Sequence, residues 1–128
     1  MKIEHFAINV ADPVAMAGWY CRHFGLVIAR KMDTPPFTHF LRDPGTGVML
    51  EIYNNPPDQV PNYAANDPLL LHLAFATDHL DADREALLTA GATHVSSQTL
   101  PGGTCFAMLR DPWGLSIQIC QRAPGFFA

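Results

Sequence analysis

The chain has 128 residues, of which 48% are hydrophobic and 16% are charged, which is a globular and not a disordered composition. The net charge of −4, without any cluster of lysine or arginine, argues against a nucleic-acid partner. No apolar run reaches the length of a membrane span, and the first ten residues lack the layout of a signal peptide because Glu4 and His5 interrupt it. We therefore expect one compact domain with no membrane partner.

The first predicted strand is IEHFAINV, residues 3–10, whose apolar and other residues alternate strictly. In a strand this alternation places Phe6, Ile8 and Val10 on one face and His5 on the other. The apolar set is typical of a strand that packs under helices. His5 therefore lies on the opposite face, among small neighbours.

The segment that follows carries both boundary signals of a helix. Asp12 is a good N-cap, Pro13 suits the first helical position, and Gly25 can end the helix in the left-handed conformation. Strand-like stretches then lie near 26–32, 37–42 and 47–53, and the last two are separated by the turn sequence RDPGTG. The first half of the chain thus predicts a β-α-β-β-β order.

The second half repeats this order after a Pro- and Asn-rich connector. A strand is predicted at 69–76 (LLLHLAFA), a helix in the segment 78–91, and strands near 93–98, 103–110 and 115–121. His5 and His72 are 67 positions apart, and so are Glu51 and Gln118. This spacing indicates an internal duplication. We predict an α+β fold of two βαβββ modules, about 1–53 and 69–121, with a linker at about 54–68 and a tail at 122–128.

Four polar side chains stand out on the strand faces that do not carry the large apolar residues. They are His5, Glu51, His72 and Gln118, one from each of four strands related by the duplication. A single strand histidine is more often a hydrogen-bonded structural residue than a metal ligand. Together, on one face with small neighbours, they predict a cavity whose side chains could bind a divalent ion such as zinc, nickel, cobalt, manganese or iron.

The three cysteines, Cys21, Cys105 and Cys120, are odd in number and show no CxxC spacing. This usage is typical of reduced thiols that serve as small packing residues. We therefore expect a cytoplasmic location and no disulfide framework.

The segments IEHFAINV, GVMLEIY, LLHLAFAT and DPWGLSIQI resemble the signature strands of the vicinal oxygen chelate superfamily. This superfamily includes glyoxalase I, methylmalonyl-CoA epimerase, extradiol dioxygenases, and fosfomycin and bleomycin resistance proteins. The resemblance covers nearly the whole chain. It implies that the paired modules form a cupped, mostly antiparallel sheet around a metal, with helices on the outer face, and that the protein is a homodimer.

By this resemblance the four metal-ligand positions are His5, Glu51, His72 and Gln118. Gln118 departs from the ligand pattern of the superfamily, because the enzymes of the group have a glutamate at this position. Unlike a glutamate, an amide cannot accept a proton. Gln118 therefore counts against an extradiol dioxygenase or a fosfomycin-type transferase. Glu51 is left as the expected catalytic base.

These residues predict a metal-dependent lyase or isomerase of the glyoxalase type, which transfers a proton on a small α-oxygenated carbonyl substrate. The alternative is a metal-free module of the bleomycin-resistance type, which binds a small molecule. Its aromatic surface could come from Trp19, Trp113, Phe37 and the tail APGFFA. His39 and Tyr53 are further candidates for proton transfer, although packing is the more ordinary role for both.

Overall fold

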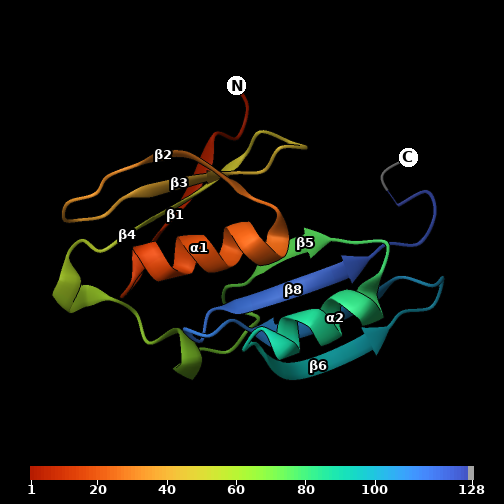
Figure 1. Ribbon diagram of the computed structural model, residues 1–128. Coiled ribbons are helices and arrows are strands. Elements are labelled where there is room, and N and C mark those ends of the chain that lie inside the picture. Colours follow the sequence, from red (N-terminus) through yellow and green to blue (C-terminus); the bar gives the residue numbers. More distant parts are fainter. Residues whose placement is uncertain (127–128) are drawn as a thin grey trace. The chain divides into compact units, whose positions relative to one another are not determined.

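The computed structural model describes residues 1–126, and the chain divides into two compact units, residues 1–61 and 62 onward. Each unit has one α-helix and one four-stranded sheet (Figure 1). The predicted α+β class and the two βαβββ modules are therefore confirmed. Phe127 and Ala128, the end of the predicted tail, lie outside the described residues.

The sheet of unit 1 has the strand order β1-β4-β3-β2. Its elements are β1 (His5–Asn9), α1 (Pro13–Phe24), β2 (Val27–Lys31), β3 (His39–Arg42) and β4 (Met49–Tyr53). β1 pairs in parallel with β4, whereas the β4–β3 and β3–β2 pairs are antiparallel. α1 is thus the connection after the first strand, and it contacts β2, β3 and β4.

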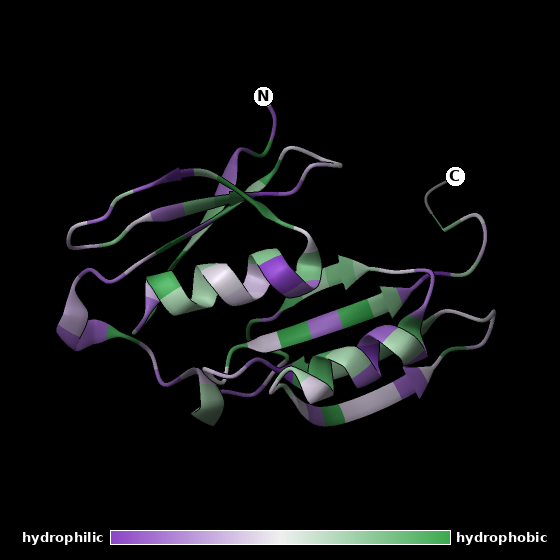
Figure 2. Ribbon diagram, viewed as in Figure 1, coloured by the Kyte–Doolittle hydropathy of each residue, from purple (hydrophilic) through white to green (hydrophobic). Residues whose placement is uncertain are grey.

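Unit 2 repeats this topology with the strand order β5-β8-β7-β6. Its elements are β5 (Leu73–Ala76), α2 (Leu80–Thr89), β6 (Thr93–Thr99), β7 (Cys105–Arg110) and β8 (Ser116–Gln121). β5 and β8 are parallel and the other two pairs are antiparallel. Apolar and polar residues alternate along β8, whose apolar face packs against α2 (Figure 2).

Helix α1 begins and ends where its sequence signals predict. The Asp12 side chain accepts a hydrogen bond from the Ala15 amide at 3.0 Å, and Pro13 is the first helical residue. Gly25 ends the helix at φ = 68°, a left-handed conformation that costs a residue without Cβ little. The side chains of Met16 and Tyr20 are completely buried, so this face of α1 covers the sheet.

The strand predicted at 69–76 is shorter than expected and begins only at Leu73. Asp67 stops it, because its side chain accepts from the Leu69 amide at 2.8 Å and its carbonyl accepts from the Leu70 amide at 3.0 Å. Such local bonds stabilise a turn in place of a strand. Leu69 and Leu70 are consequently about 80% exposed, so the prediction that they belong to the strand was wrong.

The connector between the sheets is fastened by one arginine. It carries two short 3₁₀ turns, η1 (Pro57–Gln59) and η2 (Tyr63–Ala65). Within unit 2 the guanidinium of Arg110 donates to the carbonyls of Tyr63, Asn66 and Gly114 at 2.9, 2.7 and 3.0 Å, and to the Ser116 hydroxyl at 3.2 Å. Arg110 thus holds the η2 segment through hydrogen bonds to backbone carbonyls and one hydroxyl, not through a salt bridge.

β2 and β6, the edge strands that follow the two helices in the chain, contain the same irregularity. The register of β2 shifts between Ile28 and Arg30, and that of β6 shifts between His94 and Ser96. Each shift leaves one extra residue, Ala29 or Val95, without a direct partner on the neighbouring strand. The duplication therefore extends to the two β-bulges.

None of the helices in the described part of the chain is long and apolar enough to cross a membrane. Cys21, Cys105 and Cys120 are all free thiols.

Candidate functional site

His5 and Glu51 lie together in unit 1 because β1 and β4 are parallel neighbours. The register pairs His5 with Met49 and Ala7 with Glu51, so the two side chains lie on the same face, two positions apart. The His5 Nε2 atom lies 3.1 Å from Glu51 Oε2. The side chain of Glu51 is 18% exposed and that of His5 is 38% exposed, so solvent reaches the pair from the imidazole side.

A third side chain, Glu4, contacts the other ring nitrogen of His5. The hydrogen bond between His5 Nδ1 and Glu4 Oε2 is the largest influence on His5 and raises its pKa. Burial opposes this shift, and the charges of Glu4 and then Glu51 add to it. The imidazolium form is thus favoured between two carboxylates. A cation bound here would compete with that proton, because a metal-binding imidazole is neutral. Sequence reasoning missed Glu4, although its position beside His5 was the available signal.

His72 lies directly before β5, where a backbone carbonyl orients its ring. Its Nδ1 atom lies 2.9 Å from the Pro68 carbonyl oxygen, which can only accept, so Nδ1 carries the proton. Nε2 is then the atom with a free lone pair. A carbonyl that fixes the ring through Nδ1–H is a common outer support of metal-binding histidines, and it is equally common in purely structural ones.

Gln118 lies on β8, and its side-chain oxygen accepts a hydrogen bond from a thiol. Cys120, two residues later on the same strand face, donates from Sγ to Gln118 Oε1 at 3.0 Å. An amide oxygen has two lone pairs, so this weak bond leaves one for another donor or a cation. Burial raises the pKa of the Cys120 thiol, while the nearby charge of Arg122 acts in the opposite direction.

The donor atoms of unit 1 are spaced as in a hydrogen-bonded ion pair, and the same spacing suits two ligands of one ion. Two ligands at right angles, each about 2.1 Å from a metal, lie about 3.0 Å apart, close to the 3.1 Å between His5 Nε2 and Glu51 Oε2. Unit 2 likewise offers two donors, His72 Nε2 and Gln118 Oε1. Within residues 1–126 no group of three or more His, Cys, Asp or Glu side chains is arranged to hold a metal. Each unit thus carries half of the predicted set, and the complete set stays a prediction.

Two other sequence candidates have structural roles instead. His39 is 4% exposed, and its Nδ1 atom donates to the Phe37 carbonyl at 2.6 Å. Trp19 is 7% exposed and packs edge-on against Tyr20, so it supplies core and not a ligand-binding surface.

The sequence of residues 2–119 matches the family described as "Glyoxalase/Bleomycin resistance protein/Dioxygenase superfamily". The chain belongs to this superfamily. The resemblance seen in the four signature strands is therefore confirmed. No curated protein matches the sequence at a significant level.

Solved structures of the superfamily share the fold over almost the whole chain. The antibiotic-binding protein TnmS3 from Streptomyces sp. CB03234 is 21% identical with a TM-score of 0.72, covering 96% of this chain and 97% of its own. A glyoxalase-related enzyme from Fulvimarina pelagi is 18% identical with a TM-score of 0.70, covering 95% and 88%. A glyoxalase family protein from Enterococcus faecalis is 25% identical with a TM-score of 0.71, covering 94% and 97%. Both enzymes and binding proteins thus share this superfamily fold.

Proposed function

We propose that the protein is a divalent-metal-dependent lyase or isomerase that transfers a proton on a small α-oxygenated carbonyl substrate. The observation that supports this most is the His5–Glu51 pair, whose donor atoms lie 3.1 Å apart on two neighbouring strands. His72 and Gln118 occupy the matching positions after the duplication and complete the proposed ligand set. The proposal includes a homodimer in the cytoplasm.

In this proposal a bound divalent cation would stabilise the negative charge that develops on a substrate oxygen as the neighbouring proton leaves. Glu51 would accept that proton, since it is the only carboxylate among the four residues. His5 would bind the same cation through Nε2, the ring atom that faces Glu51. His72 would be kept in the correct tautomer by the Pro68 carbonyl.

A second candidate function is the binding of a small molecule without a metal. The hydrogen bond from His72 to the Pro68 carbonyl is compatible with it, because a histidine used only for structure needs no other partner. The fold shared with the antibiotic-binding protein TnmS3 is compatible with the same function. Under this alternative, Glu51 and His72 carry no metal.

Metal titration distinguishes the two candidates. Protein treated with a chelator would be titrated calorimetrically with Zn²⁺, Ni²⁺, Co²⁺ and Mn²⁺, and Fe²⁺ under anaerobic conditions. We expect one ion per chain in the wild type and a loss of affinity of about tenfold to a hundredfold in Glu51→Ala and His72→Ala. The matched control is His94→Gln, which removes an exposed histidine that bonds only Ser97 at 2.8 Å.

The reaction is tested by exchange of the α-proton in D₂O. Glycolaldehyde and dihydroxyacetone would be followed by proton NMR with the metal-loaded protein. We expect exchange in the wild type and none in Glu51→Gln, which keeps the shape of the side chain but not its basicity. Metal binding without exchange would reject proton transfer on these carbonyl compounds, and absence of metal binding would favour the second candidate.

A further inference from the structure

Unit 2 contains a cavity of about 480 Å³ at the place where β5 and β8 end. Its walls include Ala76, Asp78, Cys120, Arg122, Ala123 and Phe126. The volume lies within the range of about 300–1,000 Å³ that is usual for small-molecule sites. Most of the wall is small or apolar, so the two charged residues determine which ligand fits.

Arg122 presents a fixed cationic group in this cavity. Its guanidinium carbon lies 4.2 Å from the centre of the Phe126 ring, so the ring covers one side of the planar group. Across residues 1–126, no carboxylate forms an ion pair with Arg122. The guanidinium edge is therefore available to bind an oxyanion through two parallel hydrogen bonds.

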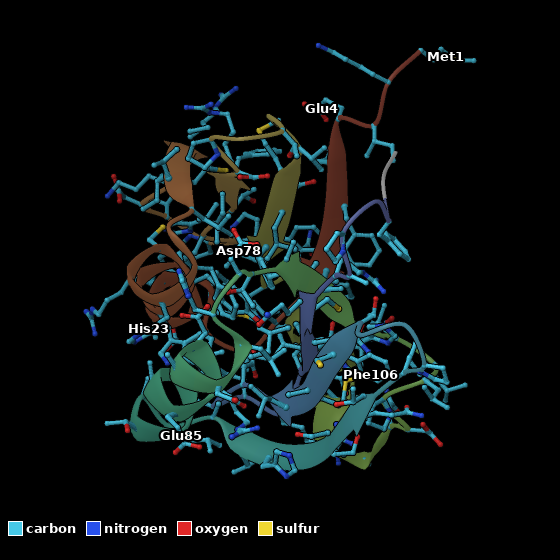
Figure 3. The ribbon with its side chains drawn as sticks, turned by 90° about the vertical axis from the view of Figure 1, so that its right-hand side faces the viewer. Met1, Glu4, His23, Asp78, Glu85 and Phe106 are labelled. Carbon is cyan, nitrogen blue, oxygen red and sulfur yellow. The ribbon has the colours of Figure 1, made fainter. Side chains whose placement is uncertain are left out.

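Asp78 limits the charge that the ligand can carry. It lies in the segment that joins β5 to α2 (Figure 3) and lines the same cavity as Arg122. One positive and one negative side chain make the wall neutral as a whole. A dianion such as phosphate would be repelled by Asp78 more strongly than a monoanionic carboxylate would, and a ligand hydroxyl could donate to it.

The cavity is also connected to one proposed metal ligand, Gln118, through Cys120. Cys120 forms part of its wall and donates to Gln118 at 3.0 Å along the same strand. Cys120 therefore lies between this cavity and Gln118, the fourth residue of the proposed ligand set.

We propose that this cavity binds the carboxylate of a small hydroxy acid through Arg122, and that the substrate of the proposed enzyme carries such a carboxylate. The second part rests on the proposed function. The first part does not, because Arg122, Phe126 and Asp78 need no metal to bind an organic acid.

The test uses the chelator-treated full-length protein, with glycolate and inorganic phosphate as separate probes. Chemical shifts of the ¹⁵N-labelled protein would be followed during each titration. We expect glycolate to bind more tightly than phosphate, and Arg122→Gln to weaken glycolate binding about tenfold or more. Arg122→Lys keeps the charge but not the planar fork, so it should lose less. The matched control is Arg30→Gln, which removes an exposed arginine on β2 and should have no effect.

Asp78→Asn tests whether Asp78 sets the preference for glycolate over phosphate. It should strengthen phosphate binding relative to glycolate, because it removes the opposing negative charge. Equal glycolate affinity in the wild type and Arg122→Gln would overturn the proposal, and so would tighter binding of phosphate than of glycolate to the wild type. Glycolate binding without any metal binding would leave this site standing and reject the proposed enzyme. Metal binding without glycolate binding would reject only the carboxylate site.

Discussion

Gln118 differs from the other three proposed ligands because its side chain accepts no proton. The amide oxygen can bind a cation, but it does not offset the cation's charge as a carboxylate does. Cys120 already donates to this oxygen at 3.0 Å. The chemistry expected of the set thus depends on Glu51 as a single base.

Gln118→Glu tests this asymmetry. The change keeps the size of the side chain, and a glutamate oxygen can still accept from Cys120. We expect metal affinity to rise at least several-fold and α-proton exchange to become faster, because a second base becomes available. Calorimetry and the D₂O exchange assay would measure both effects. Unchanged metal affinity would show that position 118 lies outside the metal site.

His39 illustrates a histidine whose role the structure makes plain. It is almost completely buried, and it holds the carbonyl of Phe37, a residue with a positive φ of 55°. Such a backbone conformation is unfavourable for a residue with a side chain and needs support from its surroundings. His39 therefore stabilises the entry of the chain into β3.

We predict that His39→Ala lowers the free energy of unfolding by about 2–4 kcal/mol, since it leaves a cavity and an unpaired carbonyl. His39→Asn should cost less, because its amide can still donate to Phe37. Denaturant titration followed by circular dichroism would measure both. A metal affinity reduced in either variant, at equal folding, would assign His39 to the site instead.

At the scale of elements, the two halves use equivalent arginines differently. Arg42 ends β3 and is exposed, whereas Arg110 ends β7 and binds three backbone carbonyls and a hydroxyl. The turn after Arg110 also comes very close to η2, because a Cβ at Gly114 would lie 2.7 Å from that of Ala64. Arg110 thus holds the η2 segment against unit 2, whereas the equivalent Arg42 is exposed.

Arg110→Met should therefore lower the free energy of unfolding by about 2–4 kcal/mol, because it leaves carbonyls without donors. It should also expose residues 62–68 to proteases. Arg42→Met, the same change at the duplicated position, should alter stability by less than about 0.5 kcal/mol. Limited proteolysis with mass spectrometry, together with thermal unfolding, would compare the two. Equal effects would contradict the fastening role of Arg110.

At the scale of the whole molecule, local signals predicted the fold well. The boundaries of α1 follow from Asp12, Pro13 and Gly25, which act on their own neighbours, and the duplicated order of strands follows from spacing. The start of β5 was missed because the Asp67 turn competes with strand pairing through short-range hydrogen bonds. The carbonyl partners of Arg110 and the contact between Phe126 and Arg122 are set by the folded chain, so no local sequence pattern predicts them. Of the candidate site, the sequence predicted that His5 and Glu51 lie on one strand face, but not the contact of Glu4 or the hydrogen bonds of His72 and Gln118.

The proposal of a single domain over 1–128 has a consequence for unfolding. Leu41 and Leu109 are completely buried at equivalent positions of β3 and β7. A unit of about 60 residues buries little of its surface and is marginally stable alone. We therefore expect Leu41→Ala and Leu109→Ala each to lower one shared unfolding transition, by about 2–5 kcal/mol. Two separate transitions in calorimetry, each sensitive to one variant only, would contradict a single domain.

The bulges in β2 and β6 affect how readily these edge strands can pair with another molecule in concentrated solution. Every residue of both strands is exposed, and each strand has a neighbour on one side only within its sheet. A regular strand of this kind would offer a straight row of amides and carbonyls to another molecule. The extra residues Ala29 and Val95 interrupt that row and increase its twist. Deleting Ala29 would straighten β2, and we expect it to promote fibrillar aggregates in concentrated solutions.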